Sequence, residues 1–425
     1  RYNGSENFSP GRRFGFFPSV AGGWLVSNEK FWTGGLAEAI SMLKFKGSYG
    51  IVGNDQIGGN RRFIYLETIN TGSSWNFGET VTSYPSYRRG EWANDNVGWE
   101  KSRKLDVGME VTFFDKLRLQ LDWFKEKRSG IFLQRSSIPE YVGITTKPYV
   151  NMGKMRNSGW DASLQYDQKV GEVNFSAMGN FTFARNVIEE QDQPDYVEKY
   201  MNRTGQARWQ SFGFVSDGLF KDEEDIATSP DQSALGQVSP GDIKYKDLNN
   251  DGVIDEKDLA PIGNGSLPKY NFAFNVGFNV KNFEVSLLFQ GIGDYDKNYG
   301  ELISNQSAYD GIFTESHKSA WTAEKWLNDE EISFPALSTT STTSNRTNDF
   351  LLKDASFLRL KTAEISYKMP KKVCDFLNAS AFKVYLSGQN LFTIDGMKTN
   401  DTPVEGSVLN FPVYRMYRLG INLTF

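Results

Sequence analysis

Residues 270–290 read Tyr-Asn-Phe-Ala-Phe-Asn-Val-Gly-Phe-Asn-Val-Lys-Asn-Phe-Glu-Val-Ser-Leu-Leu-Phe-Gln, and this stretch decides the fold. Apolar residues occupy every second position from 272 to 280 and again from 283 to 289, with polar or small residues at most positions between. Successive side chains of a strand point to opposite faces, so each run predicts a strand with one apolar face. Only Lys281 and Asn282 separate the runs, which indicates a tight hairpin.

The same pairing recurs along the chain. Residues 105–113 lead through Asp115-Lys116 into 117–123, residues 160–166 turn near Val170-Gly171 into 175–183, and the chain ends on an alternating run. The pattern therefore predicts an all-β, antiparallel fold. The predicted strands lie near 14–26, 43–52, 104–114, 117–128, 157–169, 172–185, 270–281, 283–291, 355–368, 382–393 and 414–425.

The connections between these strands alternate in length. Those at 115–116 and 170–171 are tight, whereas those at 53–103, 186–269 and 292–354 are long. Short periplasmic turns and long extracellular loops are typical of outer-membrane barrels. The strands of a soluble sandwich or propeller also alternate between apolar and polar residues. Such folds do not explain why short and long connections alternate along the chain. We therefore expect an antiparallel transmembrane β-barrel.

Composition agrees with such a barrel and excludes other classes. Hydrophobic residues make up only 39% of the chain, and no run approaches the roughly 18 apolar residues of a membrane helix. A barrel tolerates this, because only alternate residues face lipid. The net charge is −5 without a basic run, so nucleic acid is not expected as a partner. Cys374 is the only cysteine, which excludes an internal disulfide and predicts a small, partly buried side chain.

Two features predict that the chain is part of a longer polypeptide. Eleven strands is an odd number, so the first and last would run in the same direction and could not close an antiparallel barrel. The chain also begins at Arg1, without Met or the signal peptide that export requires.

A series of short motifs runs in order along the chain. They are Arg-Phe-Gly-Phe-Phe-Pro-Ser at 13–19, Gly-Trp at 23–24, Leu-Lys-Phe-Lys-Gly-Ser-Tyr-Gly at 43–50, Gly-Asn at 53–54, Trp-Glu at 99–100, Asn-Ser-Gly-Trp at 157–160, Gly-Asp-Ile-Lys-Tyr at 241–245, Ser-Gly-Gln-Asn-Leu-Phe at 387–392 and Gly-Ile-Asn-Leu-Thr-Phe at 420–425. Together they resemble the barrel signatures of the SusC/RagA-type TonB-dependent transporters of the bacterial outer membrane.

The resemblance implies a barrel of roughly 22 strands around a globular plug. Residues 1–425 resemble its C-terminal part, and the plug domain and N-terminal barrel strands have no counterpart in them. The implied function is TonB-energised import of oligosaccharides, glycans or peptides, together with a SusD-like surface lipoprotein. No bond is broken in such transport, so the resemblance does not imply an enzyme.

Two other functions stay open at this point. The alternatives are a structural or adhesin-type outer-membrane barrel without energised transport, and a membrane-embedded hydrolase. The hydrolase is disfavoured because His317 is the only histidine and stands in a Glu-Ser-His-Lys context without a nucleophile elbow. A catalytic pair among the carboxylates has no distinguishing signal.

Residues 247–258 are a candidate calcium loop. Oxygen ligands stand at positions 1, 3, 5, 7, 9 and 12 of an EF-hand-like spacing with Gly252 at position 6, although position 12 usually holds Glu. The alternative is a solvated Asp-Gly turn. Because the loop falls in the expected extracellular region 186–269, we expect bound Ca²⁺ to have a structural role. The candidate ligands are Asp247, Asn249, Asp251, Val253, Asp255 and Asp258.

Some polar and aromatic residues have weaker assignments. Asn174, Asn180, Asn271, Asn275 and Asn279 should face the barrel interior. Tryptophans of the long connections could stack on sugar rings or simply pack the loops. These are Trp75, Trp92, Trp209, Trp321 and Trp326. Phe425 resembles the terminal aromatic by which outer-membrane barrels are recognised for assembly.

Overall fold

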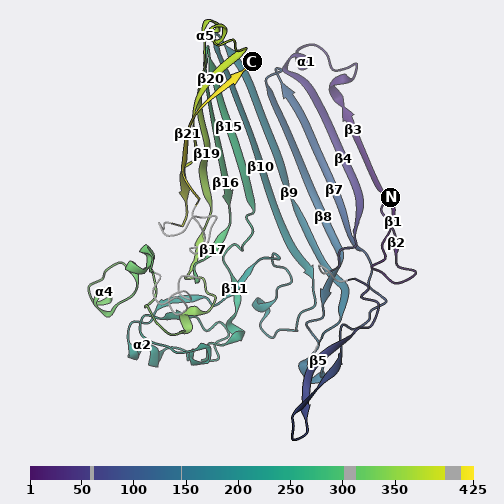
Figure 1. Ribbon diagram of the computed structural model, residues 1–425, viewed down its shortest axis with the longest axis vertical. Coiled ribbons are helices and arrows are strands. Elements are labelled where there is room, and N and C mark those ends of the chain that lie inside the picture. The colour runs from purple at the N-terminus through teal and green to yellow at the C-terminus, as the bar shows by residue number, and fades with distance from the viewer. Residues whose placement is uncertain (58–61, 145, 301–312, 398–412) are drawn as a thin grey trace.

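The computed structural model describes residues 1–57, 62–144, 146–300, 313–397 and 413–425. Its main feature is one eleven-stranded antiparallel sheet whose strands run side by side along the long axis (Figure 1). In spatial order the strands are β21 (Met416–Thr424), β20 (Ala381–Asp395), β19 (Phe357–Lys368), β16 (Phe283–Gly293), β15 (Tyr270–Val280), β10 (Val173–Glu190), β9 (Tyr149–Val170), β8 (Leu117–Gln134), β7 (Glu100–Phe113), β4 (Ile40–Asn54) and β3 (Ser19–Leu25).

Each of the eleven predicted strands corresponds to one strand of this sheet. The predicted hairpins are confirmed as well, since Val280 pairs with Phe283 across Lys281-Asn282. Phe114 and Asp115 both have left-handed backbone angles, φ 50° and 55°, as the tight turns that match strand twist require. Within the described residues β3 and β21 are the sheet edges and do not pair with each other.

Several strand boundaries differ from the sequence prediction, and β4, β7 and β10 each extend beyond their predicted ranges. The predicted strand 14–26 is divided at Pro18 into β2 (Phe14–Phe16) and β3, and β2 pairs with β1 (Tyr2–Gly4) instead of the main sheet. β8 continues past residue 128, and β9 begins before 157. The sequence pattern missed the extensions of β8 and β9 because of a bulge. There Gly130, at φ 65°, interrupts the ladder between the two strands. A bulge shifts the two-residue period, so alternation alone hides the extension.

The two ends of the sheet differ. One end holds the tight hairpin turns, the chain's C-terminus and the short helices α1 (Gly35–Ala39) and α5 (Lys371–Phe376) (Figure 1). The other end holds the long connections. These contain β5 (Ile69–Phe77), β6 (Thr82–Arg89), β11 (Ser211–Gly213), β12 (Ser216–Leu219), α2 (Glu223–Thr228), β13 (Ile243–Tyr245), β14 (Ala260–Ile262), β17 (Asp296–Asn298), α4 (Ala323–Leu327) and β18 (Leu352–Asp354).

The two faces of the sheet also differ. Asn174 pairs with Asn279, and Asn271 pairs with Thr182, so the asparagines predicted to share one face do share it. The opposite face is rich in exposed apolar side chains, as expected for a surface in contact with lipid. Among them are Val107, Trp160, Leu164, Phe181, Phe274, Phe278, Ile365, Leu386, Leu419 and Ile421. No helix in the described ranges is both long and apolar enough to cross a membrane.

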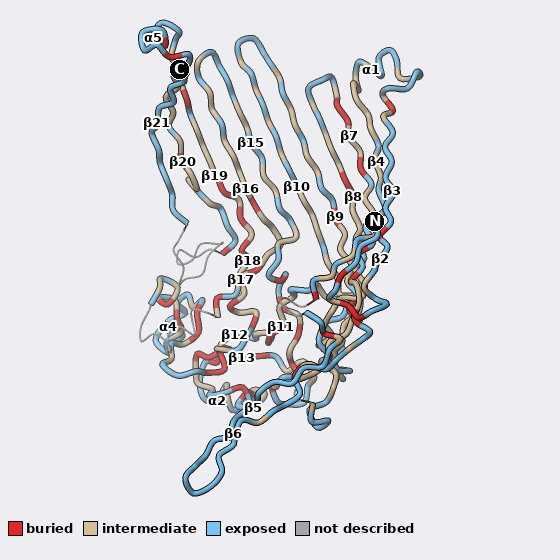
Figure 2. Tube along the Cα trace, turned by 45° about the vertical axis from the view of Figure 1, so that its right-hand side comes forward, coloured by how far each residue is buried: buried red, intermediate tan, exposed pale blue. Residues whose placement is uncertain are grey.

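The hydrophobic core lies in the long connections and not in the sheet. Figure 2 shows buried residues concentrated there. We call the described parts of the connections 191–269 and 294–356 the loop module, because they bury a common core. Its members are Phe214, Leu235, Ile243, Tyr245, Ile254, Tyr299, Ala320, Phe334, Leu351 and Ala355, joined by Phe357 and Met397.

Candidate functional site

The polar face of the sheet carries interleaved charges near the β3 edge. Lys46 of β4 lies between two acidic residues, with its Nζ 2.8 Å from Asp122 of β8 and 3.6 Å from Glu110 of β7. Lys44 adds a second contact to Glu110 at 3.3 Å. Because paired charges are costly in lipid but stable beside water or protein, this face suits a barrel interior.

A similar arrangement lies near the β21 edge. Lys383 of β20 contacts Glu364 of β19 at 3.2 Å, and the Ser366 hydroxyl donates to Glu284 of β16 at 3.3 Å. A hollow of about 200 Å³ lies on the same face and is lined by Asn275, Asn279, both glutamates and neighbouring serines. The polar face therefore offers paired charges and amides across much of its width.

A cavity lies where two strands separate. The pairing of β10 with β15 ends at Phe183 and Tyr270, yet β10 continues to Glu190. Beyond that point the segment 205–208 takes the place of β15 beside β10, and the Ile188 N–H donates to the Gln206 carbonyl at 2.9 Å. The segment 264–269 forms the other wall. The space between, which we call the fork pocket, has a volume of about 440 Å³.

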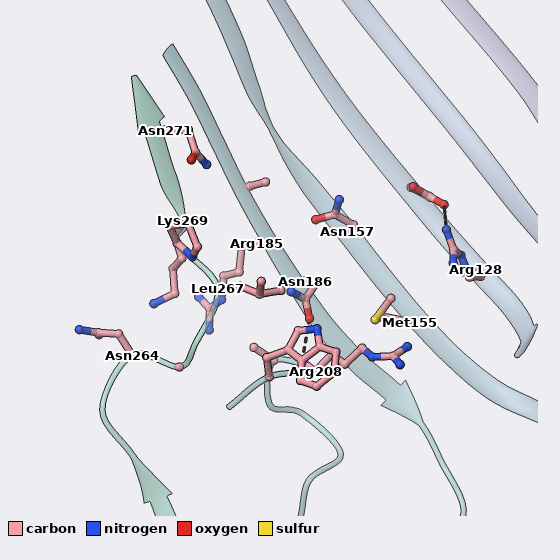
Figure 3. Close-up of a pocket in the computed structure, with 16 residues that line it drawn as sticks. Arg128, Met155, Asn157, Arg185, Asn186, Arg208, Asn264, Leu267, Lys269 and Asn271 are labelled. Atoms are coloured by element: carbon pink, nitrogen blue, oxygen red, sulfur yellow. Dashed lines mark hydrogen bonds and ion pairs between the residues drawn. The ribbon is translucent and has the colours of Figure 1, made fainter. Parts of the chain in front are cut away.

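Basic side chains outnumber acidic ones in the lining of the fork pocket. Arg128, Arg185, Arg208 and Lys269 line it, against Glu126 as the one carboxylate among the lining residues (Figure 3). The basic residues come from β8, from β10 and from two segments of the loop module. The remaining wall includes the amides of Asn157, Asn186, Asn264 and Asn271 and the ring of Trp209.

Two of the four basic groups are already paired. The Arg128 guanidinium lies 3.1 Å from Glu126, which also accepts a 2.6 Å hydrogen bond from the Ser102 hydroxyl. Lys269 lies 2.7 Å from Asp294. Sequence reasoning did not find this pocket, because single basic residues scattered over 128–269 carry no local signal.

The Gly-Asp-Ile-Lys-Tyr motif is the centre of the loop module. Asp242 is buried and accepts hydrogen bonds from the hydroxyls of Thr342 and Ser344 at 2.6 and 2.7 Å. Burial raises the pKa of the Asp242 carboxyl, although these hydroxyls and the Ser239 N–H oppose the change. Tyr245 donates its hydroxyl proton to the Thr343 carbonyl at 2.8 Å. The motif thus joins the two long connections of the loop module.

The predicted calcium loop is ordered by hydrogen bonds of its own. Asp247 accepts from the Gly252 N–H at 2.7 Å, and the Asn249 amide donates to Asp251 at 2.9 Å. Asp258 is fully buried and accepts from two backbone N–H groups, those of Leu248 and Asp255, at 2.8 and 3.0 Å. Val253 has no side-chain ligand and would contribute its carbonyl.

A lysine side chain lies among these carboxylates. The Lys257 ammonium is 3.1 Å from Asp251 and 3.4 Å from Asp255. The Asn249 amide and this ammonium lower the pKa of Asp251. Within the described residues no group of three or more His, Cys, Asp or Glu side chains is placed to share a metal. The observed arrangement fits a closed turn, and calcium would have to displace Lys257.

The tryptophans singled out in the long connections differ in exposure. Trp75, Trp209 and Trp326 are exposed, whereas Trp321 packs against a glycine of the loop module. Of these, Trp209 lines the fork pocket.

The single histidine is buried in the loop module. The Nδ1 of His317 accepts from the Thr314 N–H at 2.8 Å, and its ring packs edge-on against Phe334. Cys374 is buried, as expected for a small hydrophobic side chain.

The chain is similar in sequence and in fold to several known proteins. A family model described as "TonB dependent receptor-like, beta-barrel" matches residues 1–391. Curated relatives include TonB-dependent receptor P3 of Formosa agariphila, 26% identical over all of this chain and 43% of the relative. TonB-dependent receptor SusC of Bacteroides thetaiotaomicron is 25% identical over all of this chain and 41% of the relative.

Solved structures have the same fold. A structure of the RagAB peptide transporter superposes with a TM-score of 0.73 at 21% identity, over 99% of this chain and 45% of that one. A structure of the RagAB peptide importer in its open-open state gives a TM-score of 0.74 at 20% identity. The chain spans less than half the length of the relatives it matches. It belongs to the β-barrel family of the TonB-dependent receptors, proteins of the bacterial outer membrane.

Proposed function

We propose that this chain is the strand-rich part of an outer-membrane importer that is energised through TonB and takes up oligosaccharides or peptides. The observation that carries the proposal is the polar face of the sheet, which carries paired charges near both of its edges and the fork pocket at its loop end. A face of this kind can line an aqueous pathway, whereas the opposite apolar face contacts lipid.

The proposed partners follow from the relatives. One relative is named SusC, and the similar structures are titled as a RagAB peptide transporter or importer. We therefore propose a SusD-like lipoprotein at the loop end of the sheet and the TonB complex at the hairpin end. In outer-membrane barrels the long loops face the cell exterior, so 186–269, including the loop 247–258, would be extracellular. The relatives are named as receptors and transporters, and we propose that import involves no catalysis by this chain.

Uptake measurements on the full-length protein in its native membrane would test import. We expect deletion of the gene to abolish accumulation of a labelled oligosaccharide or peptide, and collapse of the proton-motive force to stop accumulation while surface binding persists. Gentle extraction should yield the protein together with a lipoprotein. Surface binding without energy-dependent uptake would favour the adhesin-type barrel instead. Turnover of the ligand in uncoupled cells, lost on deletion, would favour the hydrolase.

Calcium binding in the loop 247–258 stays a proposal with a structural role. Two observations support the proposal. One is the spacing of the ligands, and the other is the φ of Gly252, which at 84° lies in the left-handed region that the sharp turn of such loops requires. We expect Ca²⁺ added to chelated protein to reduce proteolysis between 186 and 269, and Asp251→Ala to abolish that protection. Lys257→Ala should tighten Ca²⁺ binding, because its ammonium competes for two ligands. Equal cleavage with and without the ion would exclude the proposal.

A further inference from the structure

The apolar face of the sheet changes character toward the loop end. On β8 the positions of this face from Leu117 to Trp123 are apolar, and Trp123 pairs directly with Trp160 of β9, with the ring centres 6.5 Å apart. Beyond these tryptophans the same face becomes basic on the three neighbouring strands β7, β8 and β9 (Figure 1). We call this surface the basic belt. Its side chains are Lys101, Arg103, Lys125, Lys127, Lys154 and Arg156.

The register of the strands places the belt on the apolar face. Lys127 stands between Glu126 and Arg128, which line the fork pocket on the polar face, so its own side chain points the other way. Arg103 of β7 and Arg156 of β9 pair directly with Lys127, and residues that pair directly share a face. The pairing is regular over this stretch, so the remaining belt residues, two positions away along their strands, have the same orientation.

Three belt residues form one row across the strands. Arg103, Lys127 and Arg156 stand directly opposite one another, an arrangement in which like charges destabilise strand pairing. Arg103 and Lys127 are exposed, so their charged ends reach the surroundings of the barrel wall. An anion bound across the row would remove this repulsion.

The protein itself neutralises only part of the belt. Arg156 lies 3.8 Å from Glu189, and Lys154 contacts Glu190. The other four side chains of the belt have no ion pair among the residues that the structure describes. The belt therefore carries an excess of positive charge on the outside of the sheet.

The position of the belt fits the headgroup layer of a membrane. Aromatic girdles mark the membrane interfaces of outer-membrane barrels, and the pair Trp123–Trp160 has that place here. Lys125 and Lys127 follow Trp123 by two and four residues, which is about 7 and 13 Å along a strand. Basic side chains beside a membrane attract anionic headgroups, and a guanidinium matches a phosphate with two parallel hydrogen bonds.

We propose that the basic belt binds the phosphate groups of lipids in the outer leaflet of the outer membrane. The occupant is a lipid headgroup and not a partner protein, because the belt is continuous with the lipid-facing surface and belongs to the strands instead of the loop module. The inference goes beyond the proposed import function, and it requires only that the loop end faces the cell exterior.

Native mass spectrometry of the full-length protein in a neutral detergent provides the test. The probe is lipid A, a glycolipid that carries phosphates, and dephosphorylated lipid A is the matched ligand without those charges. We expect lipid A to bind, and its dephosphorylated form to bind at least about tenfold more weakly. Arg103→Gln with Lys127→Gln should weaken the binding of lipid A by at least about tenfold, because each basic side chain at a membrane surface contributes roughly fivefold.

Lys104→Gln with Lys169→Gln is the matched control. It also removes two charges from the sheet, but Lys104 pairs with Glu126 and Lys169 pairs with Asn174, so both lie on the polar face. This variant should bind lipid A as the wild type does. An equal loss in this control would show that net charge, and not the belt, governs binding, and would overturn the inference.

A charge-conserving variant separates recognition from folding. Arg103→Lys with Lys127→Arg keeps both charges and should bind lipid A normally. Equal binding of the two lipid forms, or unchanged binding by the double glutamine variant, would overturn the inference. Displacement of lipid A by an equal concentration of inorganic phosphate would assign the belt to free phosphate instead. A co-purifying protein that the double glutamine variant loses, while it retains lipid A, would assign the belt to a protein partner.

This inference and import can fail independently. Uptake that depends on the proton-motive force, together with lipid A binding that ignores the belt, would leave import standing and exclude the lipid site. Belt-dependent binding of lipid A in a protein that imports nothing would leave the lipid site standing and exclude import.

Discussion

At the scale of single residues, the loop module depends on a glycine that precedes its buried carboxylate. Gly241 has a φ of 87°, a conformation that other residues adopt at a cost of about 1–2 kcal/mol. A Cβ at this position would overlap the ring of Trp321 and lie 2.6 Å from Ala336. Gly252 has a similar φ of 84°, but a Cβ there meets no atom within 4 Å. A comparison of substitutions at the two glycines therefore separates the cost of backbone strain from the cost of overpacking.

Gly241→Ala should destabilise the loop module by about 2–5 kcal/mol, the sum of the backbone cost and the overpacking. Gly252→Ala should cost only about 1–2 kcal/mol, because just the backbone cost applies. Hydrogen exchange of the amides in 239–245 would measure both. An equal loss of protection in the two variants would show that the packing of Trp321 on Gly241 contributes nothing.

At the scale of elements, the length of β8 and β9 matters most. A transmembrane strand needs roughly 9–11 residues, whereas β8 has 18 and β9 has 22. Both strands therefore continue beyond the membrane toward the loop module, and the fork pocket lies on these extensions. The β8–β9 loop is then fixed to the β10 connection by Asp192, which accepts from the N–H groups of Ser136 and Ser137 and contacts Arg135 at 3.1 Å.

This contact should depend on pH. Burial raises the pKa of Asp192, but the Ser137 N–H and O–H, the Ser136 N–H and the charge of Arg135 outweigh it and leave the pKa below the ordinary 3.8. A lowered carboxyl pKa adds stability that is complete above 3.8 and disappears as the pH falls through the lower value.

We expect the protection factor of the amides in 135–137, which is the intrinsic exchange rate divided by the observed rate, to fall on acidification below pH 3.8, and Asp192→Asn to leave it low at every pH. Asp231→Asn, which alters a carboxylate that accepts from the N–H of neighbouring Ser233, is the control and should leave 135–137 unchanged. A wild-type protection factor that does not change with pH in this range would exclude the role of Asp192.

At the scale of the whole molecule, the asymmetry between hairpin end and loop end sets the orientation in the membrane. Long loops face the cell exterior in outer-membrane barrels, and short turns face the periplasm. The orientation can be tested by labelling, because the native Cys374 is buried and contributes little background. Val197 in the loop module is 91% exposed, and Phe376 at the hairpin end is 85% exposed.

A membrane-impermeant maleimide should label Val197→Cys on intact cells. Phe376→Cys should react only after the outer membrane is permeabilised, since α5 would lie in the periplasm. The two variants are controls for each other because their exposures are nearly equal. The opposite labelling pattern would reverse the proposed orientation and remove the lipoprotein from the loop end.

The sequence by itself determined the strands of the main sheet, the tight hairpins between neighbouring strands and the polar face. The two-residue period is a local property of the backbone, and tight hairpins bring neighbouring runs into register, as at Lys281-Asn282. Motif spacing also pointed to the loop 247–258 and to the family. The bulge at Gly130 was not predicted, because one extra residue breaks the two-residue alternation from which the strands were predicted.

Only the tertiary structure decided what the long connections do. The fork pocket unites Arg185, Arg208 and Lys269 from three segments, and Asp242 meets Thr342 and Ser344 a hundred residues away. Lys257 lies among the carboxylates that sequence spacing assigned to calcium. Such contacts depend on how long loops close over the end of the sheet. Their closure follows from the burial of a common core, for which the linear sequence has no period.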